Sequence, residues 1–369
     1  MLRVRSPSFQ EVSNVILNAV PRDRDTAIQM LQTFVTSNED PGRSANFKST
    51  KPDRMDTIIK ALRQPDVSQD SHMVLLLLKS LKILSRKHDN RLNAGVGSSH
   101  DTHVRFITLD RLEFCFLANF RFLLTTRSFS CARGVEDIRI VLDYQRNACN
   151  CRIGAEAANV LLNLCYERRN VESVISCGGV PPLLDALSSD EVEMQANAAG
   201  AIQSICFQDV GRKSIRGTGG ILQFVKLLDS EHTKVRLRSV GAVHNVSSDP
   251  KAIQIIRHNG GIPKLVRMLR SPHVSIKGSA AGALQNLSRE IASRIVIRDL
   301  DAVGPLSDLL SADDTQAQVC AAGALLNLLG PELATKEEKQ REGLGKIVSL
   351  ILSVSIMFQG LEEAFPLIV

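Results

Sequence analysis

The hydrophobic pattern of residues 152–329 repeats a helix of small apolar residues that ends in Asn and a bulky residue. The copies read AANVLLNLC around Asn163, AAGAIQSIC around Ser204, SVGAVHNVS around Asn245, AAGALQNLS around Asn286 and AAGALLNLL around Asn327. Each of these five rung positions lies 41 residues after the one before. A period in the low forties with helical patterning alone predicts an α-solenoid, in which every copy buries its apolar face on its neighbours.

A glycine pair keeps the same step between these helices. It stands at Gly178-Gly179, Gly219-Gly220 and Gly260-Gly261, and degenerates to Asp301-Ala302. Glycine adopts positive φ without strain, so the pair predicts a sharp turn that ends one helix and starts the next. Leucine-type residues at i, i+3, i+4 spacing after the pair predict a second helix, and each copy therefore holds three helices.

The stretch GGIPKLVRMLRSPHVSIKGSAAGALQNLSRE, from Gly260 to Glu290, resembles the consensus of the armadillo repeat family. HEAT arrays have a similar period but two helices in each unit, and the glycine pair with a following proline favours armadillo. The resemblance covers about half of the chain. It implies an all-α fold, a right-handed armadillo-type α-solenoid of three-helix repeats with a period of 41.

The pattern divides the chain into six segments. We expect N-terminal helices at 1–36, a linker at 37–54, a degenerate first repeat at 55–95, an insertion at 96–133, regular repeats at 134–330 and an incomplete terminal repeat at 331–369. The last segment lacks the Ala-rich third helix. It either folds back as a cap or marks a truncated array.

The insertion at 96–133 interrupts a helix join and is rich in Phe in a chain otherwise poor in aromatic residues. Removing it would join Asn93-Ala94-Gly95 to Gly134-Val135-Glu136 in a regular armadillo sequence. Two interpretations stay open. The segment is a surface loop with a specific role, or it is non-coding sequence carried into the gene model.

The rung positions are the first candidate site. In the resembled family the third helices line a concave groove, and an Asn at the matching position bonds the backbone of an extended peptide. Asn163, Asn245, Asn286 and Asn327 match it, whereas Ser204 departs from the pattern. An amide carries both donor and acceptor and so can satisfy a peptide N–H and C=O together. The alternative is that these residues bond between helices and hold the stack.

Selectivity is expected from neighbours on the same helical face, four, seven and eleven residues before each rung. These neighbours include Asn159, Asn197, Lys234 and Arg238. Nuclear-import adaptors of the resembled family commonly have Trp four residues before the rung, but this chain has no Trp. The basic Lys234 and Arg238 favour an acidic ligand instead, as in catenin-like binding.

Charge is distributed unevenly, although the net charge is only +6. Basic residues dominate from Arg212 to Arg298, and acidic residues follow from Asp299 onward. A basic band favours an acidic partner segment. A solvated outer face is the alternative explanation.

Composition argues against catalysis and metal binding. The eight Cys are scattered apart from Cys149-Asn150-Cys151, the His residues are isolated, and no phosphate loop, HExxH or GxSxG occurs. We expect no catalytic residue, no cofactor and no metal. The start of the chain lacks the Gly and early Cys of lipid anchors, and no stretch is long and apolar enough to span a bilayer.

These observations together predict a non-enzymatic scaffold that binds an extended, acidic protein segment in the groove of residues 150–330. We expect protein partners, no nucleic acid and no stable membrane insertion, with a cytoplasmic or nuclear location. Two alternatives remain: an armadillo-type regulator of small GTPases, and a vacuole- or membrane-associated adaptor.

Overall fold

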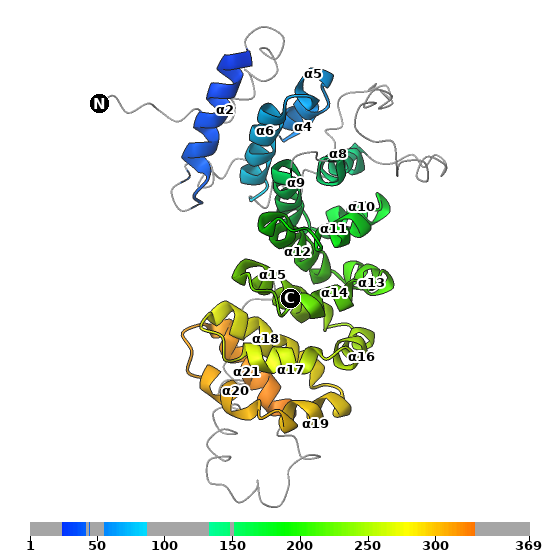
Figure 1. The fold of residues 1–369 in the computed structure, drawn as a ribbon, viewed down its shortest axis with the longest axis vertical. Helices are drawn as coiled ribbons and strands as arrows, with labels where there is room; N and C mark the ends of the chain where they lie inside the picture. Colours follow the sequence, from blue (N-terminus) through cyan, green and yellow to red (C-terminus); the bar gives the residue numbers. More distant parts are fainter. Residues whose placement is uncertain (1–23, 42–43, 45–54, 87–132, 148–150, 329–369) are drawn as a thin grey trace, which may run out of the picture.

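The computed structural model describes residues 24–41, 44, 55–86, 133–147 and 151–328. These residues form helices without strands, stacked along one long axis (Figure 1). The expected helix before residue 24, most of the linker, nearly all of the insertion and the terminal repeat lie outside the described residues.

Four complete three-helix repeats follow one another between residues 168 and 328. Their helices are α10 (Arg168–Ser176), α11 (Val180–Ala186) and α12 (Val192–Phe207); α13 (Asp209–Gly217), α14 (Gly220–Leu227) and α15 (Thr233–Val246); α16 (Pro250–His258), α17 (Gly261–Met268) and α18 (Val274–Leu287); α19 (Ile291–Asp299), α20 (Val303–Leu309) and α21 (Thr315–Leu328). First helices begin at Asp209, Pro250 and Ile291, so corresponding elements recur every 41 residues.

The N-terminal part is less regular. It contains α2 (Arg24–Asn38), α4 (Asp56–Leu62), α5 (Pro65–Ser68), α6 (Ser71–Leu84), α8 (Arg133–Asn147) and α9 (Cys151–Leu164). Helix α6 packs on α9, and α9 packs on α12, although residues 87–132 separate α6 from α8 in sequence.

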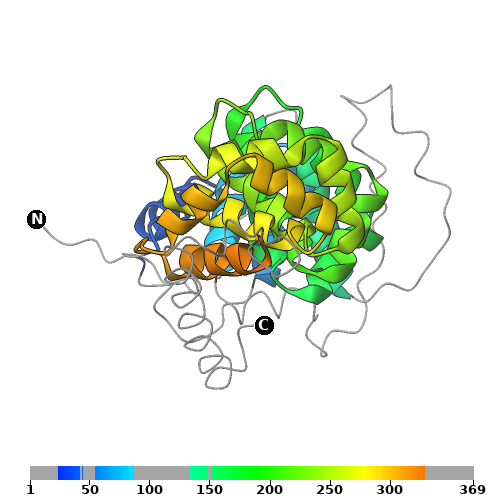
Figure 2. The same cartoon turned by 90° about the horizontal axis from the view of Figure 1, so that it is seen from below.

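The third helices form one continuous row. Helix α2 packs on α6, and then α6, α9, α12, α15, α18 and α21 each pack on the next. In Figure 1 the shorter first helices α10, α13 and α16 lie along the opposite side. Figure 2, seen along the long axis, shows α2 in blue and α21 in orange on the same side of the stack. The third-helix row therefore presents one side of the molecule from end to end.

The turns between first and second helices have the geometry predicted from the glycine pairs. Gly178, Gly219 and Gly260 have φ of 65°, 75° and 71°. In the degenerate pair Asp301 takes the same place with φ of 53°. Asp tolerates the left-handed region better than most residues, which explains how the turn survives without glycine.

Small residues let the third helices approach one another. A Cβ on Gly282 would collide with the ring of His244 from the preceding repeat, and one on Gly200 would collide with the Leu162 side chain. The Ala residues of these helices are almost wholly buried, for example Ala198, Ala242 and Ala280. The core is thus a continuous aliphatic strip beneath the third-helix row.

Candidate functional site on the third-helix face

The five rung residues lie near the C-terminal ends of α9, α12, α15, α18 and α21, one on each helix of the row. Asn163, Asn245 and Asn327 are partly exposed, whereas Ser204 and Asn286 are buried. The row places these side chains at successive steps along one face of the molecule. This third-helix face, formed by α9, α12, α15, α18 and α21, is the candidate site.

The amide groups of three rungs join neighbouring repeats. Asn286 Nδ2 donates to the carbonyl oxygen of His244 at 3.2 Å and to Ser247 Oγ at 3.0 Å. The Ser247 hydroxyl in turn donates to the same carbonyl at 2.6 Å. We call this arrangement, an Asn amide bonded to a carbonyl and a serine of the preceding third helix, the serine clip.

The serine clip recurs at two other rungs. Asn327 Nδ2 donates to Gln285 O at 3.2 Å and to Ser288 Oγ at 3.0 Å. Asn163 Nδ2 donates to Lys82 O and Ser85 Oγ, both at 3.2 Å. At these rungs the contacts match the alternative interpretation, in which the Asn holds the stack.

The two central junctions lack the clip. Asn245 Nδ2 donates to Gln203 O at 2.9 Å, but Cys206 stands where the clip would have a serine. At the junction of α9 and α12 both partners differ, since Cys165 replaces the serine and Ser204 replaces the Asn. Both thiols are buried, and burial raises the pKa of each to about 12. They therefore stay neutral.

The predicted neighbours of the rungs have unequal roles. Asn197 Nδ2 donates to Ala155 O at 2.9 Å, which is a contact between repeats. Lys234 forms an exposed ion pair with Glu193. Asn159 is partly exposed on α9. The positive charge of Lys234 is thus already partly balanced within the face.

Arg238 differs from Lys234 in having no acidic partner among the described residues. Its side chain is partly buried, and its Cδ and Nε lie 3.3 Å from where a Cβ on Gly200 would stand. The glycine therefore makes room for the arginine stem against α12. Arg238 brings a positive charge to the third-helix face that nothing in the described part of the chain neutralises.

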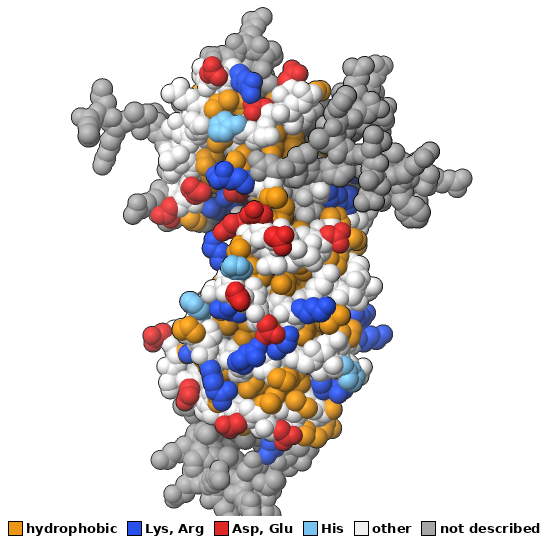
Figure 3. Space-filling model, viewed as in Figure 1, with side chains coloured by type: hydrophobic (Ala, Val, Ile, Leu, Met, Phe, Trp, Pro, Cys, Tyr) orange, Lys and Arg blue, Asp and Glu red, His pale blue; other side chains and the backbone are white. Residues whose placement is uncertain are grey.

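Much of the basic band serves contacts between repeats rather than a ligand. Arg216 pairs with Asp249 at 2.7 Å and Arg257 pairs with Glu290 at 2.9 Å, at equivalent places one period apart. The hydrogen bond from Arg257 holds the pKa of Glu290 below its usual range. Figure 3 shows Lys and Arg side chains over the lower half of one face, with Asp and Glu among them. Counting formal charges along the sequence therefore overstates the free positive charge.

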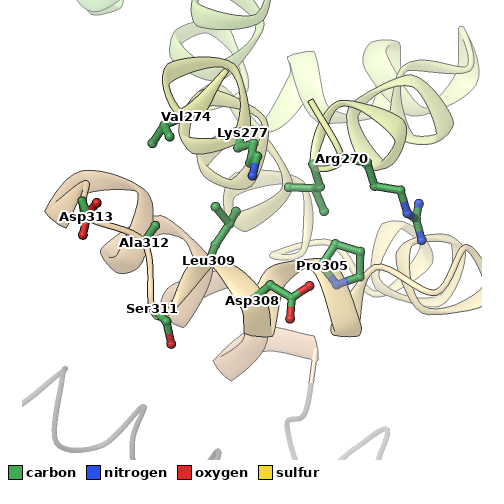
Figure 4. Close-up of a pocket in the computed structure, with 10 residues that line it drawn as sticks. Arg270, Val274, Lys277, Pro305, Asp308, Leu309, Ser311, Ala312 and Asp313 are labelled. Carbon is green, nitrogen blue, oxygen red and sulfur yellow. The ribbon is translucent and has the colours of Figure 1, made fainter. Parts of the chain in front are cut away.

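Two surface pockets lie at equivalent places one repeat apart, where a second helix leads into a third. The first, of about 430 Å³, has Arg270 and Lys277 on one side and Asp308 on the other (Figure 4). In the second, of about 420 Å³, Asp229 pairs with Arg267. Because each pocket carries both signs of charge, neither selects one class of ligand by its charge.

The described residues hold no group of three or more His, Cys, Asp or Glu placed to bind a metal ion. Among the same residues, no helix is long and apolar enough to cross a membrane.

Comparisons with known proteins agree with this architecture. Residues 168–207 and 249–289 match the model of the Armadillo/beta-catenin-like repeat. No curated protein matches the chain by sequence.

Solved structures of engineered proteins share the fold. A designed armadillo repeat protein, YIII(Dq)4CqI, is 17% identical with a TM-score of 0.58, and the match covers 74% of this chain and 100% of that one. An engineered protein, target OR497, is 20% identical with a TM-score of 0.63, covering 87% of this chain and 68% of that one. A third, YIII(Dq.V1)4CPAF, was solved in complex with the peptide (KR)4; it is 17% identical with a TM-score of 0.56, covering 75% of this chain and 100% of that one.

The stacked three-helix units define an α-solenoid. Two of its units, within residues 168–207 and 249–289, match the armadillo repeat model, and the stack as a whole has the fold of designed armadillo repeat proteins.

Proposed function

We propose that this chain is a non-enzymatic scaffold that binds an extended, acidic protein segment along the third-helix face. The observation that carries the proposal is Arg238, a partly buried cation on that face without an acidic partner among the described residues. A guanidinium binds a carboxylate through two parallel hydrogen bonds, so Asp or Glu of a ligand is its natural partner.

The other groups proposed to bind the ligand lie on the same face. They are Asn159, Asn197, Ser204, Asn245 and Lys234, whereas the predicted rungs Asn163, Asn286 and Asn327 hold neighbouring repeats together through the serine clips. An extended segment suits such a face because its backbone offers a donor and an acceptor at every residue. Each hydrogen bond adds only about 0.5–1.5 kcal/mol, so the charged contact at Arg238 is needed for selectivity.

The outline of the molecule and a structural relative support the proposal. Figure 3 shows the outline indented at mid-height, on the side where Figure 1 places α15. The designed armadillo protein solved with (KR)4 has a charged peptide as its ligand. That peptide is basic, whereas the uncompensated charge on the face of this chain is positive and calls for an acidic ligand.

The test is a binding titration with two labelled peptides, an alternating Asp-Glu octapeptide and (KR)4, followed by fluorescence anisotropy. We expect the acidic peptide to bind and Arg238→Glu to weaken it about tenfold or more, which corresponds to about 1.4 kcal/mol. Lys251→Glu is the matched control, because Lys251 is exposed on the first helix α16. Equal losses in both variants, or tighter binding of (KR)4, would contradict an acidic ligand on this face.

A further inference from the structure

Asn245 is chemically unlike the other Asn rungs. An Asn amide nitrogen carries two hydrogens. At Asn163, Asn286 and Asn327 the serine clip provides at least two acceptors for them, a carbonyl and a serine hydroxyl. The amide hydrogens of these three rungs are therefore engaged in joining repeats.

At Asn245 the described residues provide a single oxygen acceptor, Gln203 O. Cys206, in the clip position, is a buried and neutral thiol, which accepts hydrogen bonds only weakly. One amide hydrogen of Asn245 thus stays available, on a side chain that is partly exposed. The same rung lies on α15, the helix that carries Arg238.

A second, independent observation falls at the same junction. Gln203 Oε1 on α12 is buried and has no hydrogen-bond partner in the described part of the chain. The side-chain amide of Gln203 packs against α15 in the space that a Cβ on Gly241 would need. A buried acceptor without a donor is unfavourable, and an incoming N–H would satisfy it.

The three groups share one face at the junction of α12 and α15. Arg238, Gly241 and Asn245 are spaced by three and four residues, so they follow one another along one side of α15. Gln203 lies against the middle of that series, at Gly241, and the Arg238 stem lies one turn away, at Gly200. The junction therefore offers an acceptor, a donor and a cation together.

We propose that this junction, made of Gln203, Arg238 and Asn245, is the anchor for one acidic residue of the bound segment. The Gln203 amide rotates so that Oε1, buried in the unbound chain, accepts a backbone N–H of the ligand. Asn245 Nδ2 donates to a backbone carbonyl, and Arg238 binds the Asp or Glu carboxylate. The clipped rungs Asn163, Asn286 and Asn327 use their amide hydrogens to hold the repeats together and donate none to the ligand. This assignment rests on the proposed function of the third-helix face.

The experiment uses the full chain and the alternating Asp-Glu octapeptide. We expect Asn245→Ala to weaken binding about tenfold, and Asn286→Ala to leave affinity within about twofold while lowering the urea midpoint of unfolding. If Asn286→Ala does not fold, Asn327→Ala at the last clip replaces it. Equal losses of affinity in Asn245→Ala and a clipped-rung variant would overturn the anchor.

Installing a clip gives a sharper test, since it changes binding without removing Asn245. Cys206→Ser supplies the missing hydroxyl, which engages the free amide hydrogen and lowers affinity several-fold with no loss of stability. Cys165→Ser is the matched control, because this buried cysteine has the same position in its repeat as Cys206, and the next rung is Ser204 rather than an Asn. Unchanged affinity in Cys206→Ser contradicts the role given to Asn245.

The two levels of the proposal fail differently. Failure of the acidic peptide to bind the unaltered chain would sink the proposed function. Loss of binding in Arg238→Glu with full binding in Asn245→Ala would leave the acidic ligand in place and overturn only the anchor.

Discussion

The junctions between third helices are of two kinds. At α6/α9, α15/α18 and α18/α21 a serine clip joins the helices, whereas α9/α12 and α12/α15 have a cysteine in place of the serine. In both kinds of junction the third helices pack side by side in the same row. The residue two positions after each rung decides what the next Asn rung can do. A serine there takes an amide hydrogen of that Asn and makes it structural, whereas a cysteine leaves the hydrogen available to a ligand.

The clip at α6/α9 also shows how many residues have been added to the irregular part of the chain. Asn163 reaches Lys82 O across 81 residues of sequence, whereas later rungs reach the equivalent carbonyl across 42. The excess of 39 residues is close to the length of the proposed insertion at 96–133. The repeat register thus continues from α6 to α9 as if those residues were absent.

Removing a clipped rung is expected to have the largest effect on stability. Asn286→Ala removes the donor to Ser247 Oγ and one of the two side-chain donors to the His244 carbonyl, and should cost about 2 kcal/mol. Asn245→Ala breaks one bond and should cost about 1 kcal/mol. Urea unfolding followed by circular dichroism measures both. Equal midpoints for the two variants would remove the distinction between the junctions.

The repeats and turns could be predicted from the sequence, but the clip could not. The positive φ of Gly178, Gly219 and Gly260 follows from the glycine pair alone, since the requirement is local. Ser247 and Ser288 complete Asn-Val-Ser and Asn-Leu-Ser tripeptides that look like accidental glycosylation sequons. Their function depends on an Asn 39 residues later, and that partner is known only once the helices are stacked.

The sequence alone also could not predict which basic residues of the third-helix face have an acidic partner. Lys234 and Arg238 look alike as cations on one helical face, yet Glu193 pairs with Lys234 alone. The partner lies on the preceding third helix, so the packing of α12 on α15 decides it. The position of α12 relative to α15, and not the composition of α15, therefore makes the two basic residues different.

Converting an unclipped junction to a clipped one should have the next largest effect. Cys206→Ser is expected to raise the stability of the α12/α15 junction by about 0.5–1.5 kcal/mol, because the new hydroxyl bonds both Asn245 and the Gln203 carbonyl. Hydrogen exchange of α15 amides measures this locally. Cys165→Ser should show no such gain, and a gain there would mean that the serine acts without an Asn.

Deleting residues 96–133 tests whether the α6/α9 clip is independent of the insertion. The chain should keep its helical circular dichroism and its stability within about 1 kcal/mol, because loop-closure entropy depends only weakly on loop length. Ser85→Ala should lower the stability of the deletion variant by as much as it lowers the stability of the full chain. An unfolded or aggregated deletion variant would show that residues 96–133 contribute to the fold.

The smallest effect is expected from His244, whose backbone carbonyl belongs to the α15/α18 clip and whose ring packs on Gly282. Burial lowers the pKa of His244 from the ordinary 6.5, so the folded state favours the neutral ring. The unfolded chain binds the proton more readily, and stability is therefore present above pH 6.5 and declines as the pH falls toward the folded pKa, by less than about 1 kcal/mol between pH 7 and 6.

His244→Gln places there the residue found at the equivalent positions Gln203 and Gln285, and should remove this part of the decline. Urea midpoints at the two pH values measure it, and parallel pH dependence in both proteins would show that His244 does not titrate with folding.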